Sequence, residues 1–291
     1  TPDDFGATGE ATRLELARWL IAEENPLTRR VAVNHIWSRL FGAGLVSTPD
    51  DFGATGEAPS HPALLDWLAS EFARLGWSRK QLIRLIVTSA TYRQSSAHRA
   101  DILDLDPLNR LLARQNRLRL EGEILRDTAL AVSGLLTPAI GGPSFRPPLP
   151  EDLYDVGRSK GWQAATGAGL YRRSLYIITL RSVLYPLLTT FDGPDAADAC
   201  VRRERSNTPL QALTMMNDPA FVEAARALAL RVLRQTPGQP GKRPALLFEL
   251  ALHRPPRPDE LERLHAFLSG QRERVRRAGD QALMIPGPAA A

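Results

Sequence analysis

Apolar residues recur at every third or fourth position along most of this chain of 291 residues. This spacing places them on one face of an α-helix, which must then be buried against a neighbouring element. We therefore predict a mainly α fold, an irregular multi-helical bundle. The predicted helices cover residues 13–22, 28–41, 62–75, 79–92 and 107–136, and four more begin at Pro209, Pro219, Pro244 and Pro258.

Capping residues support several of these boundaries. Thr208, followed by proline at the first helical position and Gln211 at the third, is typical of a helix start. Ser78 and Gln81 form a similar pair, and Ser60 is expected to cap the helix that enters through Pro62. Gly42 and Gly76 are expected to end the helices that precede them.

One segment favours a β conformation. The run RRSLYIITLR is rich in β-branched and aromatic residues, so we predict one short β segment or hairpin near 171–181. The preceding region is rich in Pro and Gly and has no periodicity, which is typical of a long connection and makes it the best candidate for a domain boundary. The predicted division is a helical region at 12–136, a connection at 137–170, a helical region at 171–278 and a loose tail at 279–291.

The eleven letters TPDDFGATGEA occur twice, at residues 1–11 and 48–58. Each copy precedes a helix that carries Trp-Leu, at Trp19 and at Trp67, so an ancient structural repeat is one interpretation. A recent duplication or a join between genes is the alternative, and residues 1–11 are then a duplicated or extraneous segment.

Charge and cysteine content restrict the class of protein. The 37 Lys and Arg residues outnumber the 32 Asp and Glu residues, but the two signs are interleaved along the chain. A nucleic-acid interface usually needs a basic stripe, so weak nucleic-acid binding is only our third hypothesis. The single cysteine, Cys200, excludes an internal disulfide and a CxxCH haem motif in this chain. No apolar stretch approaches the ~20 residues of a membrane span, and no signal peptide is recognisable.

The densest polar cluster is FDGPDAADACVRRERSN, directly ahead of the helix that begins at Pro209. Its acids and arginines suit an ion-pair network that holds a loop, a ligand or substrate site, or a hard-cation site. The spacing does not match a calcium loop, and we predict no metal and no cofactor in this chain. The candidate site residues, which include a nearby basic stretch, are Asp192, Asp195, Asp198, Cys200, Arg202, Arg203, Tyr171, Arg172 and Arg173.

No catalytic motif accompanies this cluster. Neighbouring arginines would favour the thiolate of Cys200, but no local motif links it to a histidine, and a buried structural thiol is the simpler interpretation. Glu121 and Glu123 are two residues apart on a predicted helix, so they are expected to face different ways. HExxH, GxSxG and a phosphate-binding glycine loop are all missing from the sequence. Whether the chain is an enzyme stays open.

Several long stretches together resemble the planctomycete-type C-terminal domain, the family called domain of unknown function 1553. The resemblance extends from Arg13 to Leu268. It rests on NPLTRRVAVNHIWSRLFGAGLVSTPDDFGATGEAPSHPALLDWLA, GWSRKQLIRLIVTSATYRQSS, DPLNRLLARQNRLRLEGEILRDTALAVSGLL, YRRSLY, FDGPDA and SNTPLQALTMMNDPAFVEAA.

The resemblance implies a setting for the chain but no catalytic residues. Members are similar to large exported proteins in which a companion domain and often a cytochrome c domain precede this one, and neighbouring genes suggest polysaccharide degradation. The implied role is an accessory module for partner docking or glycan association, periplasmic or at the cell surface, with any haem bound upstream. The alternative is a hydrolase or glycan-modifying enzyme that uses the loop at 192–205. Only the second TPDDFGATGEA copy matches the family, whose members usually end with LLNLDEF where this chain has ALMIPGPAAA.

Overall fold

The computed structural model describes residues 12–150, 153 and 161–278. The first TPDDFGATGEA copy and the tail after position 278 lie outside them. The chain divides into two compact units, Thr1–Arg119 and Leu120–Ala291. The described residues form α-helices, short 3₁₀ turns and isolated β-bridges, so the prediction of a mainly α fold is confirmed. The division falls at 119/120, whereas the sequence placed the boundary within 137–170.

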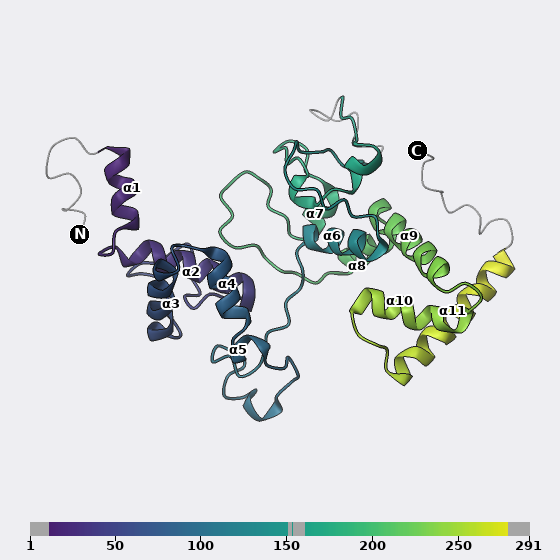
Figure 1. Cartoon of the computed structure of the whole chain (residues 1–291), viewed down its shortest axis with the longest axis horizontal. Coiled ribbons are helices and arrows are strands. Elements are labelled where there is room, and N and C mark those ends of the chain that lie inside the picture. The colour runs from purple at the N-terminus through teal and green to yellow at the C-terminus, as the bar shows by residue number, and fades with distance from the viewer. Residues whose placement is uncertain (1–11, 151–152, 154–160, 279–291) are drawn as a thin grey trace. The chain divides into compact units, whose positions relative to one another are not determined.

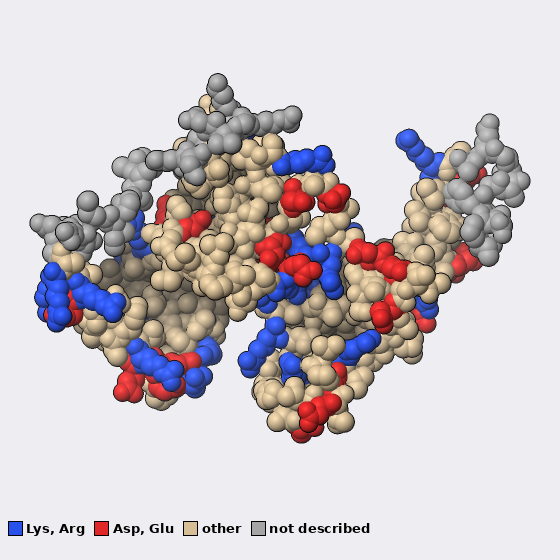
Figure 2. Space-filling view, turned by 180° about the vertical axis from the view of Figure 1, so that it is seen from behind, with Lys and Arg blue, Asp and Glu red and all other residues tan. Residues whose placement is uncertain are grey.

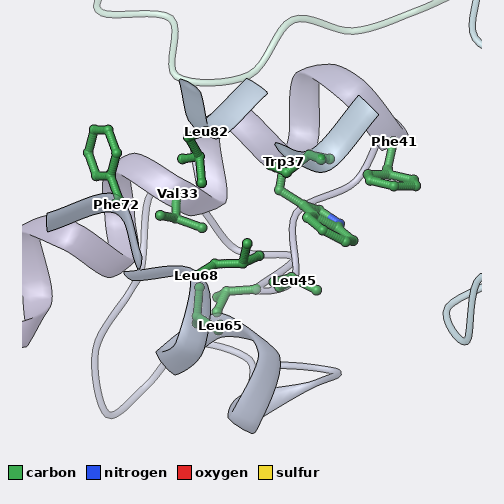
Figure 3. Close-up of a cluster of buried hydrophobic side chains, with 10 residues drawn as sticks. Val33, Trp37, Phe41, Leu45, Leu65, Leu68, Phe72 and Leu82 are labelled. Carbon is green, nitrogen blue, oxygen red and sulfur yellow. The ribbon is translucent and has the colours of Figure 1, made fainter. Parts of the chain in front are cut away.

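The first unit, purple to blue in Figure 1, is built on α2 and α3 packed together. Its core is a continuous apolar cluster in which the Trp37 and Phe41 rings stack with centroids 4.2 Å apart (Figure 3). Burial of aromatic and aliphatic side chains of this size supplies most of the stability of a small unit. The helices are α1 (Arg13–Ile21), α2 (Pro26–Phe41), α3 (Pro62–Arg74), α4 (Arg79–Val87) and α5 (Ala90–Arg93).

Local sequence sets most ends of these helices. Thr12 forms a full capping box with Glu15 at the start of α1, and Gly42 ends α2 with φ of 89°. The Ser78 hydroxyl accepts the N–H of Gln81 at 3.4 Å, as the cap signal predicts. The prediction for Ser60 is wrong, because His61 is the N-cap of α3 and makes no side-chain cap, while the Ser60 hydroxyl contacts the His61 ring.

The second TPDDFGATGEA copy forms a compact loop between α2 and α3. The Thr48 hydroxyl donates to the carbonyl of Asp51 at 2.8 Å and accepts the N–H of Glu57 at 3.0 Å. The Asp51 carboxylate accepts the Thr55 hydroxyl at 2.8 Å. A Cβ at Gly56 would collide with the backbone of Asp51, so the loop requires glycine there. The motif therefore closes its loop through hydrogen bonds between its own residues.

The predicted long helix over 107–136 is wrong in its first half. Residues 107–121 form a non-helical segment in which Asn109 and Leu112 have φ of 52° and 54°. The Asn109 amide donates to Arg114 O at 2.8 Å and to Asn116 Oδ1 at 2.9 Å, which fixes the turn. Side-chain bonds of this kind compete with helix formation. Leu108 and Leu111 are 78% and 68% exposed, so the apolar spacing of the segment does not correspond to a buried helical face.

The second unit, teal to yellow in Figure 1, has α6 and α9 packed side by side at its centre. Its core cluster includes Phe145, Leu149 and Trp162, so the Pro/Gly-rich region at 137–170 contributes directly to the core of this unit. The helices are α6 (Gly122–Ser133), α7 (Pro186–Thr190), α8 (Pro209–Asn217), α9 (Pro219–Gln235), α10 (Arg243–Leu252) and α11 (Pro258–Ala278).

The segment near 171–181 does not form a strand. It makes two 3₁₀ turns, η5 (Gly167–Tyr171) and η6 (Ser174–Tyr176), and the isolated bridges Thr137–Arg172, Phe145–Ile177 and Leu180–Val183. Ile177 is buried, whereas Thr179 is exposed. No partner strand is available in the described region to complete a ladder.

The C-terminal helices follow their sequence signals. Thr208 and Gln211 form the predicted capping box, and Asp218 caps α9. The helices α10 and α11 contact each other across the proline-rich turn, as the expected hairpin does. No described helix is both long and apolar enough to cross a membrane.

Candidate functional site

Arg126 is a buried charge in the second unit. It lies on the inner face of α6 with Gly122, Leu130 and Ser133, and only 2% of its surface is exposed. Its Nη1 donates to Arg172 O at 3.0 Å and to Ser174 Oγ at 3.2 Å, and its Nη2 donates to Leu170 O at 2.7 Å. Burial lowers the pKa of this guanidinium. The hydrogen bonds to carbonyls compensate part of the cost of desolvating the charge.

The backbone that Arg126 binds is shaped by two 3₁₀ turns. Ser174 lies in the second turn, and its N–H donates to the carboxylate of Asp127 at 2.7 Å. The Arg126 guanidinium also lies 5.4 Å from the centroid of the Phe145 ring. Two consecutive residues of α6 therefore hold the segment 170–174 in place.

A cavity of about 250 Å³ opens beside Arg126. This volume is near the lower end of the ~300–1,000 Å³ found for small-molecule sites. Part of its lining is apolar and proline-rich, and residues at the start of α9 contribute two carboxylates. We call it the Arg126 cavity; it is lined by Arg126, Leu130, Pro147, Pro148, Leu149, Pro150, Leu170, Tyr171, Tyr185, Pro186, Asp218, Pro219, Ala220 and Glu223.

Tyr171 and Glu223 form a hydrogen-bonded pair in this cavity. The Tyr171 hydroxyl donates to Glu223 Oε1 at 2.6 Å, and this bond, with smaller contributions from burial and charge, raises the pKa of Tyr171 to about 12. The tyrosine therefore stays protonated at neutral pH and holds the carboxylate in a fixed orientation. Within the described part of the chain, the second oxygen, Oε2, accepts no hydrogen bond.

Asp218 and Tyr185 complete the polar lining. Asp218 caps α9 through Oδ1, which accepts the N–H of Ala220 at 2.9 Å. Burial raises the pKa of Asp218, although its hydrogen bonds and the charge of Arg126 act in the opposite direction. Burial also raises the pKa of Tyr185 far above its usual value. The cavity thus combines a guanidinium, two phenol groups and two carboxylates in a partly dehydrated setting.

The loop proposed from the sequence lies apart from this arrangement. Asp192, with φ of 58°, accepts the N–H and the hydroxyl of Ser206, both at 2.8 Å. The fully buried Gln211 donates to Ser206 Oγ at 2.8 Å and to Thr190 O at 3.0 Å. These bonds close the loop onto the start of α8. Asp192 thus contacts Ser206 and Gln211.

Arg203 joins the loop to α6. It makes a two-pronged ion pair with Glu123 at 2.8 and 2.9 Å and lies 3.5 Å from Glu121. The prediction that Glu121 and Glu123 face different ways is therefore wrong. Glu121 is the N-cap residue of α6 and has extended backbone angles, so helical spacing does not apply to it.

The remaining loop candidates are exposed and have separate partners. Asp195 accepts the N–H of Ala197 at 2.9 Å, and Arg202 lies 3.9 Å from Glu204. Asp198 is exposed. The expectation of a buried thiol is wrong, since Cys200 is exposed and its Sγ contacts Arg202 O at 3.3 Å. A ligand role for these residues stays a prediction.

The three residues of the basic stretch 171–173 also lie in different surroundings. Tyr171 lines the Arg126 cavity, whereas the Arg172 side chain donates to the carbonyls of Pro143 and Gly141 and lies 3.9 Å from the centroid of the Tyr176 ring. Arg173 is exposed. Of the nine candidates, Tyr171 is the one that the structure brings into the cavity.

Charge on the surface is mixed in sign. Figure 2 shows Lys and Arg interspersed with Asp and Glu on the visible face, with no continuous basic stripe there. Among the described residues, no group of three or more His, Cys, Asp or Glu side chains is arranged to hold a metal ion.

The comparison with protein families shows which family the chain belongs to. The family described as "Protein of unknown function (DUF1553)" matches residues 12–268. The chain belongs to this DUF1553 family. No curated protein and no solved structure matches it. The match leaves out residues 1–11, the first copy of the repeated motif.

Sequence reasoning missed most of the cavity of this DUF1553 member. Leu125 and Ala129 of α6 pack against the core cluster, but the buried residues of this helix are Gly122, Arg126, Leu130 and Ser133. A signal for Asp218 was present, because an N-cap aspartate places its carboxylate at a helix start. No local signal identifies Glu223 or Tyr185, whose role depends on contacts between distant segments.

Proposed function

We propose that this chain is an accessory binding module and that the Arg126 cavity holds the end of a glycan chain. The observation that carries this proposal is the convergence of two tyrosines, two carboxylates and a guanidinium on one cavity with an apolar wall. Carboxylates accept hydrogen bonds from sugar hydroxyls, and apolar walls pack against the C–H face of a sugar ring. A volume of about 250 Å³ suits a small unit such as a terminal sugar residue.

The proposed setting is an exported, cytochrome-c-linked protein, periplasmic or at the cell surface, with any haem bound by an upstream domain. Family membership supports this setting only through the resemblance of the chain to such proteins. In this arrangement the module brings a polysaccharide end close to the partner domains. This proposed role requires no catalytic reaction in the chain itself.

Partner docking is a second proposed role, favoured by one helix. No residue of α1 is buried, and Leu14, Trp19 and Ile21 are 57%, 40% and 61% exposed. An isolated helix of nine residues is marginal in water, so an apolar surface that covers it would stabilise it. The companion domain is the proposed partner. The double variant Leu14→Glu with Ile21→Glu, which places two charges on this apolar surface, should abolish capture of that domain and leave glycan binding intact.

The test of glycan binding uses the full chain and a panel of oligosaccharides, with affinity measured by calorimetry. Tyr171→Phe removes the hydroxyl that holds Glu223, and we expect it to weaken binding about tenfold. The control is Tyr92→Phe, a matched change in the first unit. Binding that is unaffected by Tyr171→Phe, or failure of every oligosaccharide to bind, would contradict the proposal.

A further inference from the structure

The charges that line the Arg126 cavity do not balance. Asp218 and Glu223 contribute two carboxylates, and Arg126 is the only basic residue among the lining residues that the structure describes. Its guanidinium donates to the carbonyls of Leu170 and Arg172, and no ion pair in the described part of the chain joins it to either acid. These bonds hold the 170–174 backbone, and Arg126 also lies 3.9 Å from Asp127, which is not among the described lining residues. With Asp218 and Glu223 ionised, the described lining carries one net negative charge.

The surroundings of the two acids determine how costly this excess negative charge is. Both lie in the first turns of α9, and the lining also includes Pro147, Pro148 and Leu149, which offer no side-chain donor. In a partly dehydrated site, an uncompensated carboxylate is costly, and a nearby cation is correspondingly favourable. Glu223 keeps an unused acceptor, Oε2, within the described region, and its other oxygen is fixed by Tyr171 at 2.6 Å.

The chemistry of the lining discriminates between sugars. A sulfated or carboxylated sugar would add a third negative charge to two acids and one guanidinium that is already bonded. A neutral sugar would leave the excess charge uncompensated. A sugar with a primary ammonium group supplies one positive charge and three donors, and its remaining hydroxyls suit the Tyr185 and Tyr171 oxygens.

We propose that the Arg126 cavity selects an amino sugar with a free ammonium group, held by Glu223 and Asp218. This inference rests on the proposed function, and names the class of sugar. The raised pKa of Asp218 agrees with it, because the burial that disfavours the lone carboxylate is the condition that a bound ammonium relieves. No covalent step is involved.

The experiment measures the affinity of the full chain for four oligosaccharides of equal length: β-linked glucosamine, N-acetylglucosamine, glucose and a sulfated glucose. We expect glucosamine to bind at least tenfold more tightly than its acetylated form, which has lost the charge. Glu223→Gln and Asp218→Asn should each remove most of this preference. Glu204→Gln, an exposed acid outside the cavity, is the matched control and should keep it.

The outcomes separate the two proposals. If the neutral and amino sugars bind equally and Tyr171→Phe still weakens both, the selectivity is refuted and glycan binding stands. If a lysine-containing peptide binds as tightly as glucosamine, or the sulfated sugar binds best, the assignment of an amino sugar is refuted. If no sugar binds, both proposals fail. Thermal unfolding of each variant confirms that it is folded before its affinity is compared.

Discussion

The two units bury their polar groups in different ways. The buried polar residues in the described part of the first unit are Asn25, Asn34 and Asn109. The Asn25 amide caps α2, and the other two amides hold nearby loop backbone. Asn34 bonds both the N–H and the carbonyl of Val46, at 2.9 and 3.0 Å. The second unit also buries a neutral amide, that of Gln211, but in addition it buries the guanidinium of Arg126 beside a cavity. The comparison separates a unit whose described buried polar groups are neutral amides from one that also buries a charge beside a cavity.

The energetic difference between the two units depends on whether a buried group is neutral or charged. A neutral amide that is fully hydrogen-bonded costs little to bury, whereas an ion costs several kcal/mol even after the protein relaxes. Arg126 offsets this cost with its bonds to Leu170, Arg172 and Ser174 and with its position near the Phe145 ring. A well-packed apolar residue would avoid that cost. The retained charge therefore marks the second unit as the place to look for function.

The largest expected effect lies in the apolar core of the first unit. Phe41→Ala removes a side chain that is 1% exposed and stacks on Trp37, and we expect a loss of about 4 kcal/mol. Hydrogen exchange on the full chain should show faster exchange in α2 and α3 with little change in α6 and α9. Equal loosening of both units would contradict their separation.

A smaller loss is expected from Arg126→Ala in the second unit. The change leaves the carbonyls of Leu170 and Arg172 without their buried donor, so we expect destabilisation of about 3 kcal/mol and loss of sugar binding. Chemical denaturation and calorimetry measure the two effects. An Arg126→Ala protein with unchanged stability would show that the buried charge has no structural partner of consequence.

The pH dependence of stability sharpens the comparison further. The pKa of Asp218 is raised in the folded state, so the native protein holds that proton more tightly than the unfolded chain. Its contribution to stability is therefore greatest below the unfolded pKa of about 3.9 and is lost as pH rises through the folded value. Asn is an equally good N-cap and does not titrate, so wild type should lose stability relative to Asp218→Asn over that rise. The opposite slope would place Asp218 in a favourable charged pair.

The smallest effect is expected in the loop that the sequence singled out. Asp195 is exposed and bonds only the N–H of Ala197 within the described residues, so Asp195→Ala should change stability by less than about 0.5 kcal/mol. Glycan binding should also be unchanged. A loss of binding would restore the alternative in which the loop at 192–205 forms the functional site.

The sequence by itself determined the helical framework of this protein. Thr12, Thr208 and Asp218 cap their helices through bonds to residues two or three positions away, and Gly42 ends α2 with a left-handed angle. Such signals are readable because both partners lie within one helical turn. The family relationship was readable for a similar reason, since it rests on long contiguous strings.

Only the tertiary structure decided where the chemistry lies. Arg126 and Arg172 are 46 residues apart and Tyr171 and Glu223 are 52 apart, so their contacts have no local pattern. The same limit explains the error over 107–121, where side-chain bonds to the backbone overrode a helical spacing. Periodicity reports which residues avoid water, but a cavity forms where segments distant in sequence meet, and that depends on packing in three dimensions.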